Sequence, residues 1–301
     1  MDWRAKAVVQ NVLAVVPFGS DLNNLLQLRV GGLRNFEAHV EGKVKDWIGM
    51  MNLLAESGVD IRNAVTVEIG TGWFPTLPVC FWLAGTQACN TYDQKRHLRL
   101  GLTRRLVFTL EPHLESIAEA AGLPFAPIQE RYKKIGSDIL AACEISYRAP
   151  ADAARTGLPD QSVDIVFSNS VLEHVTPCAL TAIMQETRRI LRPAGAAVHC
   201  VACNDHYAHF DQSISYVNYL RFTAPEWRRW NNSLQYQNRL RASDFLQVAE
   251  SCGLTVTAAR QYVRPGVEPA LSRLPIAPDF ERYSRSELAV TTVNFVCRAS
   301  P

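Results

Sequence analysis

Residues 64–75, Ala-Val-Thr-Val-Glu-Ile-Gly-Thr-Gly-Trp-Phe-Pro, constrain the fold more than any other part of the chain. A β-branched apolar run ends there in Gly70-Thr71-Gly72, and a second apolar run follows from Pro75 to Leu83. Two glycines allow a tight turn and the close approach of a ligand, and proline suits the first position of a helix. The pattern predicts a strand, a glycine turn and a helix whose first N–H groups face an oxygen-rich ligand.

A second predicted strand, residues 86–92, is followed by Asp93. Nucleotide-binding βαβ units hold a ribose diol with an acidic side chain at this point, although a turn or a helix cap would also explain the residue. A dinucleotide site would need a third glycine where this chain has Pro75, and it has Glu68 two residues before the first glycine instead. This pattern resembles the first motif, acid-x-Gly-x-Gly, of the class I S-adenosylmethionine-dependent methyltransferases.

A third strand is predicted at residues 163–167, where an apolar run ends in Ser168-Asn169-Ser170. Since ligands collect at the carboxyl ends of parallel strands, these polar residues should share the edge of the sheet that carries Gly70 and Asp93. The following Leu-Glu-His-Val, residues 172–175, resembles the fourth motif of the same family, and residues 186–195 resemble its Arg-x-Leu-Arg-Pro-Gly-Gly motif.

The resemblance implies S-adenosylmethionine as the cofactor and an α/β fold, a Rossmann-like, seven-stranded, mostly parallel sheet with helices on both faces. It matches Asp152 to the acid that accepts a hydrogen bond from the adenine amino group, beside the backbone N–H of Ala153; a cap for the following turn is the alternative. The predicted cofactor-binding residues are Glu68, Gly70, Thr71, Gly72, Trp73, Asp93, Gln94, Asp152, Ala153, Ser168, Asn169 and Ser170.

Two further segments extend this domain, which we expect to span residues 63–301. Residues 1–62 look helical, interrupted by Gly31-Gly32, and are predicted to form an N-terminal helical cap or a packing appendage. Arg29 and Arg34 flank those glycines and could meet an anion, although solvated surface is the favoured interpretation. Residues 204–245, rich in aromatic, His, Asn and Arg side chains, are predicted to form a lid inserted at the carboxyl edge of the sheet.

The lid carries the candidate catalytic residues Asp205, His206, His209 and Asp211. One histidine oriented by a carboxylate could act as a general base, two histidines and a carboxylate could bind a metal, or all four could be structural. We expect catalysis without a metal. His174 is a further candidate base, although the resemblance favours a structural role, and it joins Tyr207 and Arg239 as candidate substrate-binding residues.

Methyl transfer depends mostly on alignment, but a hydroxyl acceptor gains from a base and an amine does not. The lid therefore favours O-methylation of a small molecule, such as a sugar or a secondary metabolite. Its arginines favour an anionic acceptor, unless they form an exposed helical face. N-methylation of a small amine, an NAD-dependent oxidoreductase and a non-catalytic cofactor-binding subunit remain alternatives.

The composition excludes other function classes. A net charge of +2 gives no bulk electrostatic case for nucleic acid or membrane binding, and 48% hydrophobic residues are ordinary for a soluble globular protein. The eight cysteines are scattered, and the single Cys-x-x-Cys pair at 200 and 203 cannot complete a zinc site. We expect reduced thiols and a cytoplasmic location, and a homo-oligomer is left open.

Overall fold

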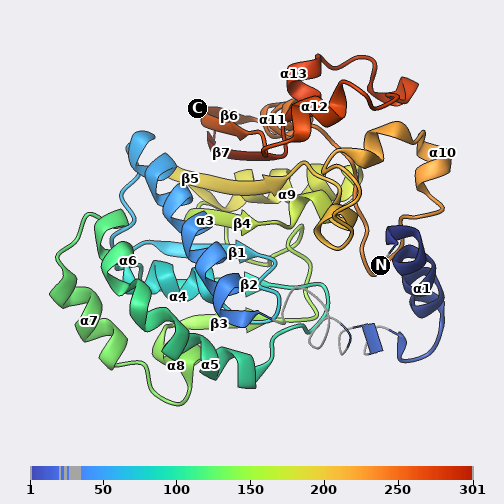
Figure 1. The fold of residues 1–301 in the computed structure, drawn as a ribbon. Helices are drawn as coiled ribbons and strands as arrows, with labels where there is room; N and C mark the ends of the chain where they lie inside the picture. Colours follow the sequence, from blue (N-terminus) through green and yellow to red (C-terminus); the bar gives the residue numbers. More distant parts are fainter. Residues whose placement is uncertain (1, 20–21, 24–25, 27–34, 300–301) are drawn as a thin grey trace.

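The computed structural model describes residues 2–19, 22–23, 26 and 35–299. Its centre is a seven-stranded sheet in the order β3-β2-β1-β4-β5-β7-β6, in which only the pairs formed by β7 are antiparallel (Figure 1). The strands are β1 (Val65–Ile69), β2 (Ala88–Tyr92), β3 (Ile145–Arg148), β4 (Val163–Asn169), β5 (Leu191–Ala202), β6 (Leu254–Tyr262) and β7 (Thr292–Ala299). The predicted fold class is confirmed.

Helices cover both faces of this sheet because neighbouring residues of the buried strands point to opposite sides. In β4, Ile165 and Phe167 belong to one hydrophobic cluster, whereas Val166 between them belongs to the other. The first cluster contains residues of α3 (Phe36–Glu56), α4 (Thr76–Leu83), α5 (Leu100–Leu110), α6 (Leu114–Ala120), α7 (Phe125–Lys133) and α8 (Ile139–Ala142). The second contains residues of α9 (Pro177–Ile190) and α11 (Ala242–Ser251).

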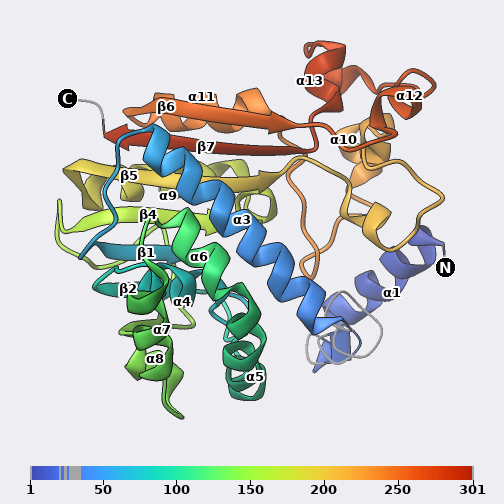
Figure 2. The same ribbon diagram turned by 60° about the vertical axis from the view of Figure 1, so that its left-hand side comes forward.

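Helix α3 runs diagonally across the first face of the sheet (Figure 2). Its N-cap is Asn35, whose side chain accepts a hydrogen bond from the N–H of Ala38. One side of the helix is buried in the core through residues at helical spacing, including Val40, Val44 and Trp47. The opposite side is polar. The predicted break at Gly31-Gly32, with Arg29 and Arg34, lies outside the described residues.

Residues 204–245, the predicted lid, are mostly irregular, with η4 (His206–His209), η5 (Asn218–Arg221) and α10 (Ala224–Trp227) as short elements. The expected lid extended to residue 245, but α11 already begins at Ala242. Helix α1 (Trp3–Val15) lies against this segment (Figure 1). The Trp3 N–H donates to Asp211 Oδ2 at 2.9 Å, and Asn11 Nδ2 donates to the Arg229 carbonyl at 2.8 Å. The N-terminal helix and the lid therefore share one cluster of aromatic residues.

The C-terminal part connects β6 to β7 through α12 (Val267–Leu271), η6 (Pro278–Phe280) and α13 (Arg285–Ala289). The remaining short elements are η2 (Glu111–His113) and η3 (Leu172–His174). All eight cysteines are free thiols. Within the described part of the chain, no helix combines the length and the apolar character needed to cross a membrane.

Candidate active site

A cavity of about 540 Å³ lies at the carboxyl ends of β1, β2 and β4. It is the place where ligands collect in open α/β sheets, because the loops that follow neighbouring strands diverge there. Most of the predicted cofactor-binding residues line it, namely Gly70, Thr71, Gly72, Trp73, Asp93, Gln94, Asp152, Ala153, Asn169 and Ser170.

The glycine turn requires both of its glycines. Gly70 has φ +79° and Gly72 has φ +73°, values in the left-handed region that other residues avoid. A Cβ on Gly70 would lie 2.5 Å from Cγ2 of Val171, whereas a Cβ on Gly72 would meet no atom within 4 Å. Gly70 is therefore needed both for its left-handed backbone and for its close packing against the loop after β4. Gly72 is needed only for its left-handed backbone.

Asp93 closes the turn from the end of β2. Its Oδ2 accepts hydrogen bonds from the Gly72 N–H at 3.1 Å and from the Tyr147 hydroxyl at 2.9 Å. Burial raises the pKa of the Asp93 carboxyl, while the hydrogen bond from Tyr147 and the nearby His97 act in the opposite direction. Oδ1 makes only a long contact of 3.4 Å to the Gly72 N–H and remains able to accept a ligand hydroxyl.

Asp152 fits both of its predicted interpretations. Its Oδ1 accepts a hydrogen bond from the Ala154 N–H at 2.9 Å, as expected for a residue that caps a turn. It also lines the cavity together with Ala153, and its side chain is exposed. Capping occupies one carboxylate oxygen and leaves the other for a ligand.

Two of the predicted cofactor-binding residues do not line the cavity. The hydroxyl of Ser168 is 2.8 Å from Nδ1 of His199, its partner in the β4–β5 pairing, because successive residues of a strand point to opposite faces and the side chain of Ser168 points away from that of Asn169. Glu68 is 3% exposed near the end of β1, and burial raises the pKa of its carboxyl to about 8. We therefore assign Ser168 a structural role in its contact with His199. Glu68 is buried in β1, directly before the glycine turn, and does not face the cavity.

Helix α3 contributes residues to the cavity that sequence analysis did not identify. His39 and Lys43 line it, and Asp46 Oδ2 accepts a hydrogen bond of 2.9 Å from Asn169 Nδ2. Burial and the nearby Lys43 lower the pKa of His39 to about 4. The three residues are spaced i, i+4 and i+7, so a polar stripe on one side of an amphipathic helix was the signal available in the sequence.

Asp205, Asp211 and His209 of the lid make contacts within the protein. Asp205 is completely buried and accepts hydrogen bonds from the Tyr207 N–H at 2.9 Å and from Asn218 Nδ2 at 3.2 Å; burial raises the pKa of its carboxyl to about 6. Asp211 binds the N-terminus of α1. His209 Nε2 lies 3.0 Å from Asn204 Oδ1.

Tyr207 and Arg239 also lie away from the cavity. The Tyr207 hydroxyl donates to the Trp230 carbonyl at 2.6 Å, and its ring packs against Trp3. Arg239 donates to the Phe222 carbonyl at 2.5 Å and stacks on Trp227. Both side chains therefore stabilise the predicted lid from within. Its aromatic residues form a hydrophobic cluster of their own together with Trp3.

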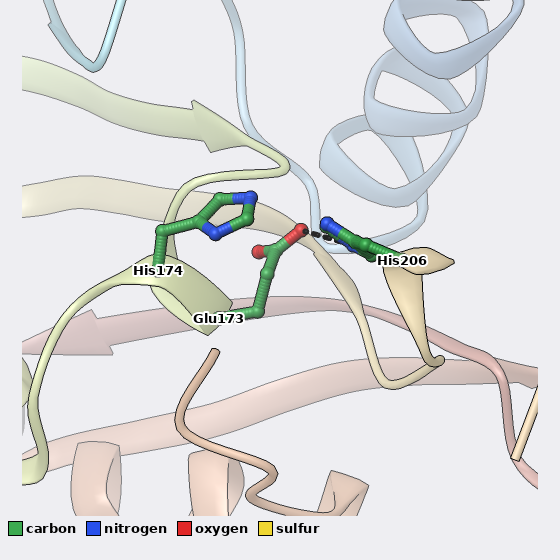
Figure 3. A group of neighbouring side chains, drawn as sticks. All are labelled: Glu173, His174 and His206. Carbon is green, nitrogen blue, oxygen red and sulfur yellow. Dashed lines mark ion pairs between the residues drawn. The ribbon is translucent and has the colours of Figure 1, made fainter. Parts of the chain in front are cut away.

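Glu173, His174 and His206 form a compact group beside the cavity, in which the three side chains point toward one another (Figure 3). His174 lines the cavity, and its Nδ1 lies 2.6 Å from the Tyr236 carbonyl. His206 Nε2 lies 3.8 Å from Glu173 Oε1, and the rings of His206 and His174 have centroids 4.8 Å apart. Burial raises the pKa of Glu173 to about 8 and lowers the pKa values of both histidines.

Glu173 and Tyr147 are two further residues that sequence analysis missed. Glu173 was visible only as a letter of the Leu-Glu-His-Val motif, and nothing in that pattern indicates that its carboxyl is 2% exposed. Tyr147 comes from the edge strand β3, and its hydrogen bond to Asp93 joins residues 54 positions apart. No local pattern predicts such a contact.

Comparison with known proteins gives one match to a family model. Residues 129–199 match the family model of a methyltransferase domain. Among curated proteins, none matches the chain significantly.

Solved structures with a similar course of the chain include a candidate sarcosine dimethylglycine methyltransferase from Galdieria sulphuraria (15% identity, 86% of this chain and 87% of that chain covered, TM-score 0.49). Phosphoethanolamine N-methyltransferase 2 from Haemonchus contortus, in complex with S-adenosyl-L-methionine, is 12% identical (85% and 53% covered, TM-score 0.47). A SAM-dependent methyltransferase from Methanosarcina mazei is 11% identical (79% and 93% covered, TM-score 0.46). Similarity at this level supports no statement about a substrate.

Proposed function

We propose that this chain, whose residues 129–199 match the family model of a methyltransferase domain, is a class I S-adenosylmethionine-dependent methyltransferase. We propose further that it methylates a hydroxyl group of a small molecule bound between the cofactor cavity and the lid. In this reaction the acceptor oxygen forms a bond to the methyl carbon as the sulfur–methyl bond breaks. The electron pair of the broken bond stays on sulfur, and the hydroxyl proton passes from the acceptor to a neighbouring base or to water.

The residues of the cavity suit the parts of the cofactor. The turn at Gly70–Gly72 allows close approach to the backbone, and Asp93 offers Oδ1 to the ribose hydroxyls. Asp152 and the N–H of Ala153 offer an acceptor and a donor to the edge of adenine. Among the described residues that line the cavity, Lys43 on α3 is the only lysine or arginine.

The position of two imidazoles beside the cavity carries the proposal that oxygen is the acceptor atom. The Tyr236 carbonyl can only accept a hydrogen bond, so Nδ1 of His174 carries a proton and its Nε2 is the free nitrogen. His206 lies next to it. Groups of this kind promote the loss of a hydroxyl proton, whereas an amine acceptor needs only to be neutral. Of the four catalytic candidates in the lid, we retain His206.

Residues 1–62 and 204–245 are proposed to act as a cap and a lid that keep water from the reacting atoms. The buried lid arginines no longer support an anionic acceptor. Arg239 donates hydrogen bonds to backbone carbonyls of the lid. Arg241 is completely buried, and its guanidinium donates hydrogen bonds to the Cys203 carbonyl and the Tyr219 hydroxyl. A negatively charged acceptor would instead have to pair with the ammonium group of Lys43 in the cavity.

The proposal is tested with S-adenosylmethionine that carries a tritiated methyl group. The purified protein is incubated with pairs of small molecules that differ only in having a hydroxyl or an amino group at one position. We expect label in the hydroxyl members of active pairs. Label in the amino members alone would contradict O-methylation and leave the enzyme an N-methyltransferase.

A further inference from the structure

We propose that Glu173, His174 and His206 bind one divalent transition-metal cation beside the cavity. One ligand atom from each side chain lies within 4.8 Å of the others (Figure 3). The sequence predicted no metal and weighed a different set of donors. In that set Asp205 and Asp211 bind other parts of the protein, and His209, whose ring centroid is 5.6 Å from that of His206, has its Nε2 3.0 Å from Asn204 Oδ1. Only His206 belongs to both sets.

The carboxyl group of Glu173 is the first reason for this assignment. It is 2% exposed, and neither oxygen makes a hydrogen bond of ordinary geometry within the described residues; the backbone groups of Glu173 and Ala202 are near enough only to oppose the rise in its pKa. Its nearest ion-pair partner is His206 Nε2 at 3.8 Å, which is too far for a hydrogen bond. Burial of an unpaired polar group is costly, and buried charges in proteins are paired or coordinate metals. A cation would provide the missing partner.

The orientation of His174 is the second reason. Its Nδ1 donates to the Tyr236 carbonyl at 2.6 Å, which fixes the ring and leaves Nε2 with a lone pair. Histidines that bind metals almost always donate their other ring N–H in this way, often to a backbone carbonyl. The backbone of His206 is held as well, since its N–H donates to Gln237 Oε1 at 3.1 Å.

The donor set specifies the class of cation. Two imidazoles and one carboxylate suit iron(II), manganese(II), cobalt(II) or zinc(II) and leave coordination positions open, whereas magnesium and calcium prefer oxygen ligands. Metal–ligand bonds of about 2.0–2.2 Å would draw the donor atoms closer together by about 1 Å. This movement is a side-chain adjustment and needs no change in the strands.

The role of the cation rests on the proposed function, although its binding does not. A cation held here would bind the acceptor hydroxyl in an open position, lower the pKa of that hydroxyl and release its proton to water. The two imidazoles would then act on the acceptor through the metal. An amine acceptor would have no use for this arrangement.

Cobalt(II) tests the site directly, because its visible absorption reports coordination by nitrogen and oxygen. The untagged protein is dialysed against a chelator and then titrated with cobalt(II), followed by absorbance and calorimetry. We expect one equivalent to bind to the wild type. Glu173→Gln keeps the shape of the side chain and His206→Ala removes one ligand, so we expect each to weaken binding at least about 100-fold. His113→Ala, in η2, removes a histidine outside the group and should bind cobalt(II) like the wild type.

Equal cobalt(II) affinity in the wild type, Glu173→Gln and His206→Ala would overturn the proposal. Zinc(II) should also raise the melting temperature of the wild type and of His113→Ala more than that of Glu173→Gln, because a ligand that binds only the folded state stabilises it. Binding of S-adenosylmethionine to the same samples separates the two proposals. If none of the samples bound S-adenosylmethionine while the wild type still bound cobalt(II), the proposed function would be contradicted and the metal site would not.

Discussion

The backbone N–H of Gly72 donates a hydrogen bond to Oδ2 of Asp93 at 3.1 Å, and this contact joins the glycine turn after β1 to the end of β2. The Tyr147 hydroxyl donates to the same oxygen from β3. The carboxyl ends of three adjacent strands are thereby linked through one side chain. One side of the cofactor cavity is thereby held in place by hydrogen bonds within the protein.

The two glycines of the turn should respond differently to alanine. Gly70→Ala adds a Cβ at 2.5 Å from Val171 and forces a left-handed backbone, so the unfolding free energy should fall by about 3 kcal/mol. Gly72→Ala incurs only the cost of the backbone conformation, about 1 kcal/mol. Urea denaturation of both variants without cofactor measures the difference. Equal losses of unfolding free energy in the two variants would contradict the close contact between Gly70 and Val171.

His206→Ala should lower kcat by about 100-fold and leave the affinity for S-adenosylmethionine unchanged, because His206 lies next to His174 and does not line the cofactor cavity. His209→Ala should lower kcat less, since His209 bonds to Asn204. Single-turnover kinetics and calorimetry separate the two quantities. A parallel loss of cofactor affinity in His206→Ala would place this residue in the cofactor site instead.

Glu68 should make the protein less stable as the pH rises. Burial raises its pKa in the folded state to about 8, above its ordinary value of 4.5. Between these values the folded chain holds a proton that the unfolded chain releases, so the free energy of unfolding falls with increasing pH, by a total on the order of 3 kcal/mol. Denaturation of the wild type and Glu68→Gln at pH 5 and pH 8 measures this contribution. The fall should be smaller in the variant by about that amount, and an identical fall would contradict the assignment.

Arg241 should be essential for the stability of the lid. Its guanidinium is completely buried and donates to the carbonyls of Cys203, Leu288 and Val290, among others. Arg241→Met removes these hydrogen bonds and leaves the carbonyls unsatisfied, which should lower the free energy of unfolding by about 3 kcal/mol or more. Arg228→Met, at an exposed position of the same lid, is the matched control and should change it by less than about 0.5 kcal/mol. Similar effects of the two substitutions would contradict the structural role of Arg241.

The sequence predicts the central fold well because the strands are short apolar runs with turn residues at their ends. The turn at Gly70, the acid after β2 and the polar end of β4 could all be assigned from local patterns. Ser168 shows the limit of such patterns. It was grouped with Asn169 and Ser170, but its side chain points to the opposite face of β4 from that of Asn169 and contacts His199, while its two neighbours reach the cavity.

The lid could not be predicted in the same way. Its aromatic and arginine residues indicated a binding surface, but they pack on one another and on Trp3, which lies some 200 positions away in the chain. Composition does not tell whether such side chains face a ligand or form a core. The pairing of Glu173 with His206 also joins distant segments, so the sequence alone could not identify that group.

Calorimetry of the purified protein with S-adenosylmethionine, S-adenosylhomocysteine and NAD⁺ tests the central claim most directly. The account predicts micromolar binding of the first two compounds, none of NAD⁺, and loss of binding in Gly70→Arg, whose side chain would fill the turn. Binding of NAD⁺ without binding of S-adenosylmethionine would contradict it, since the glycine turn would then hold a different cofactor and the chemistry would not be methyl transfer.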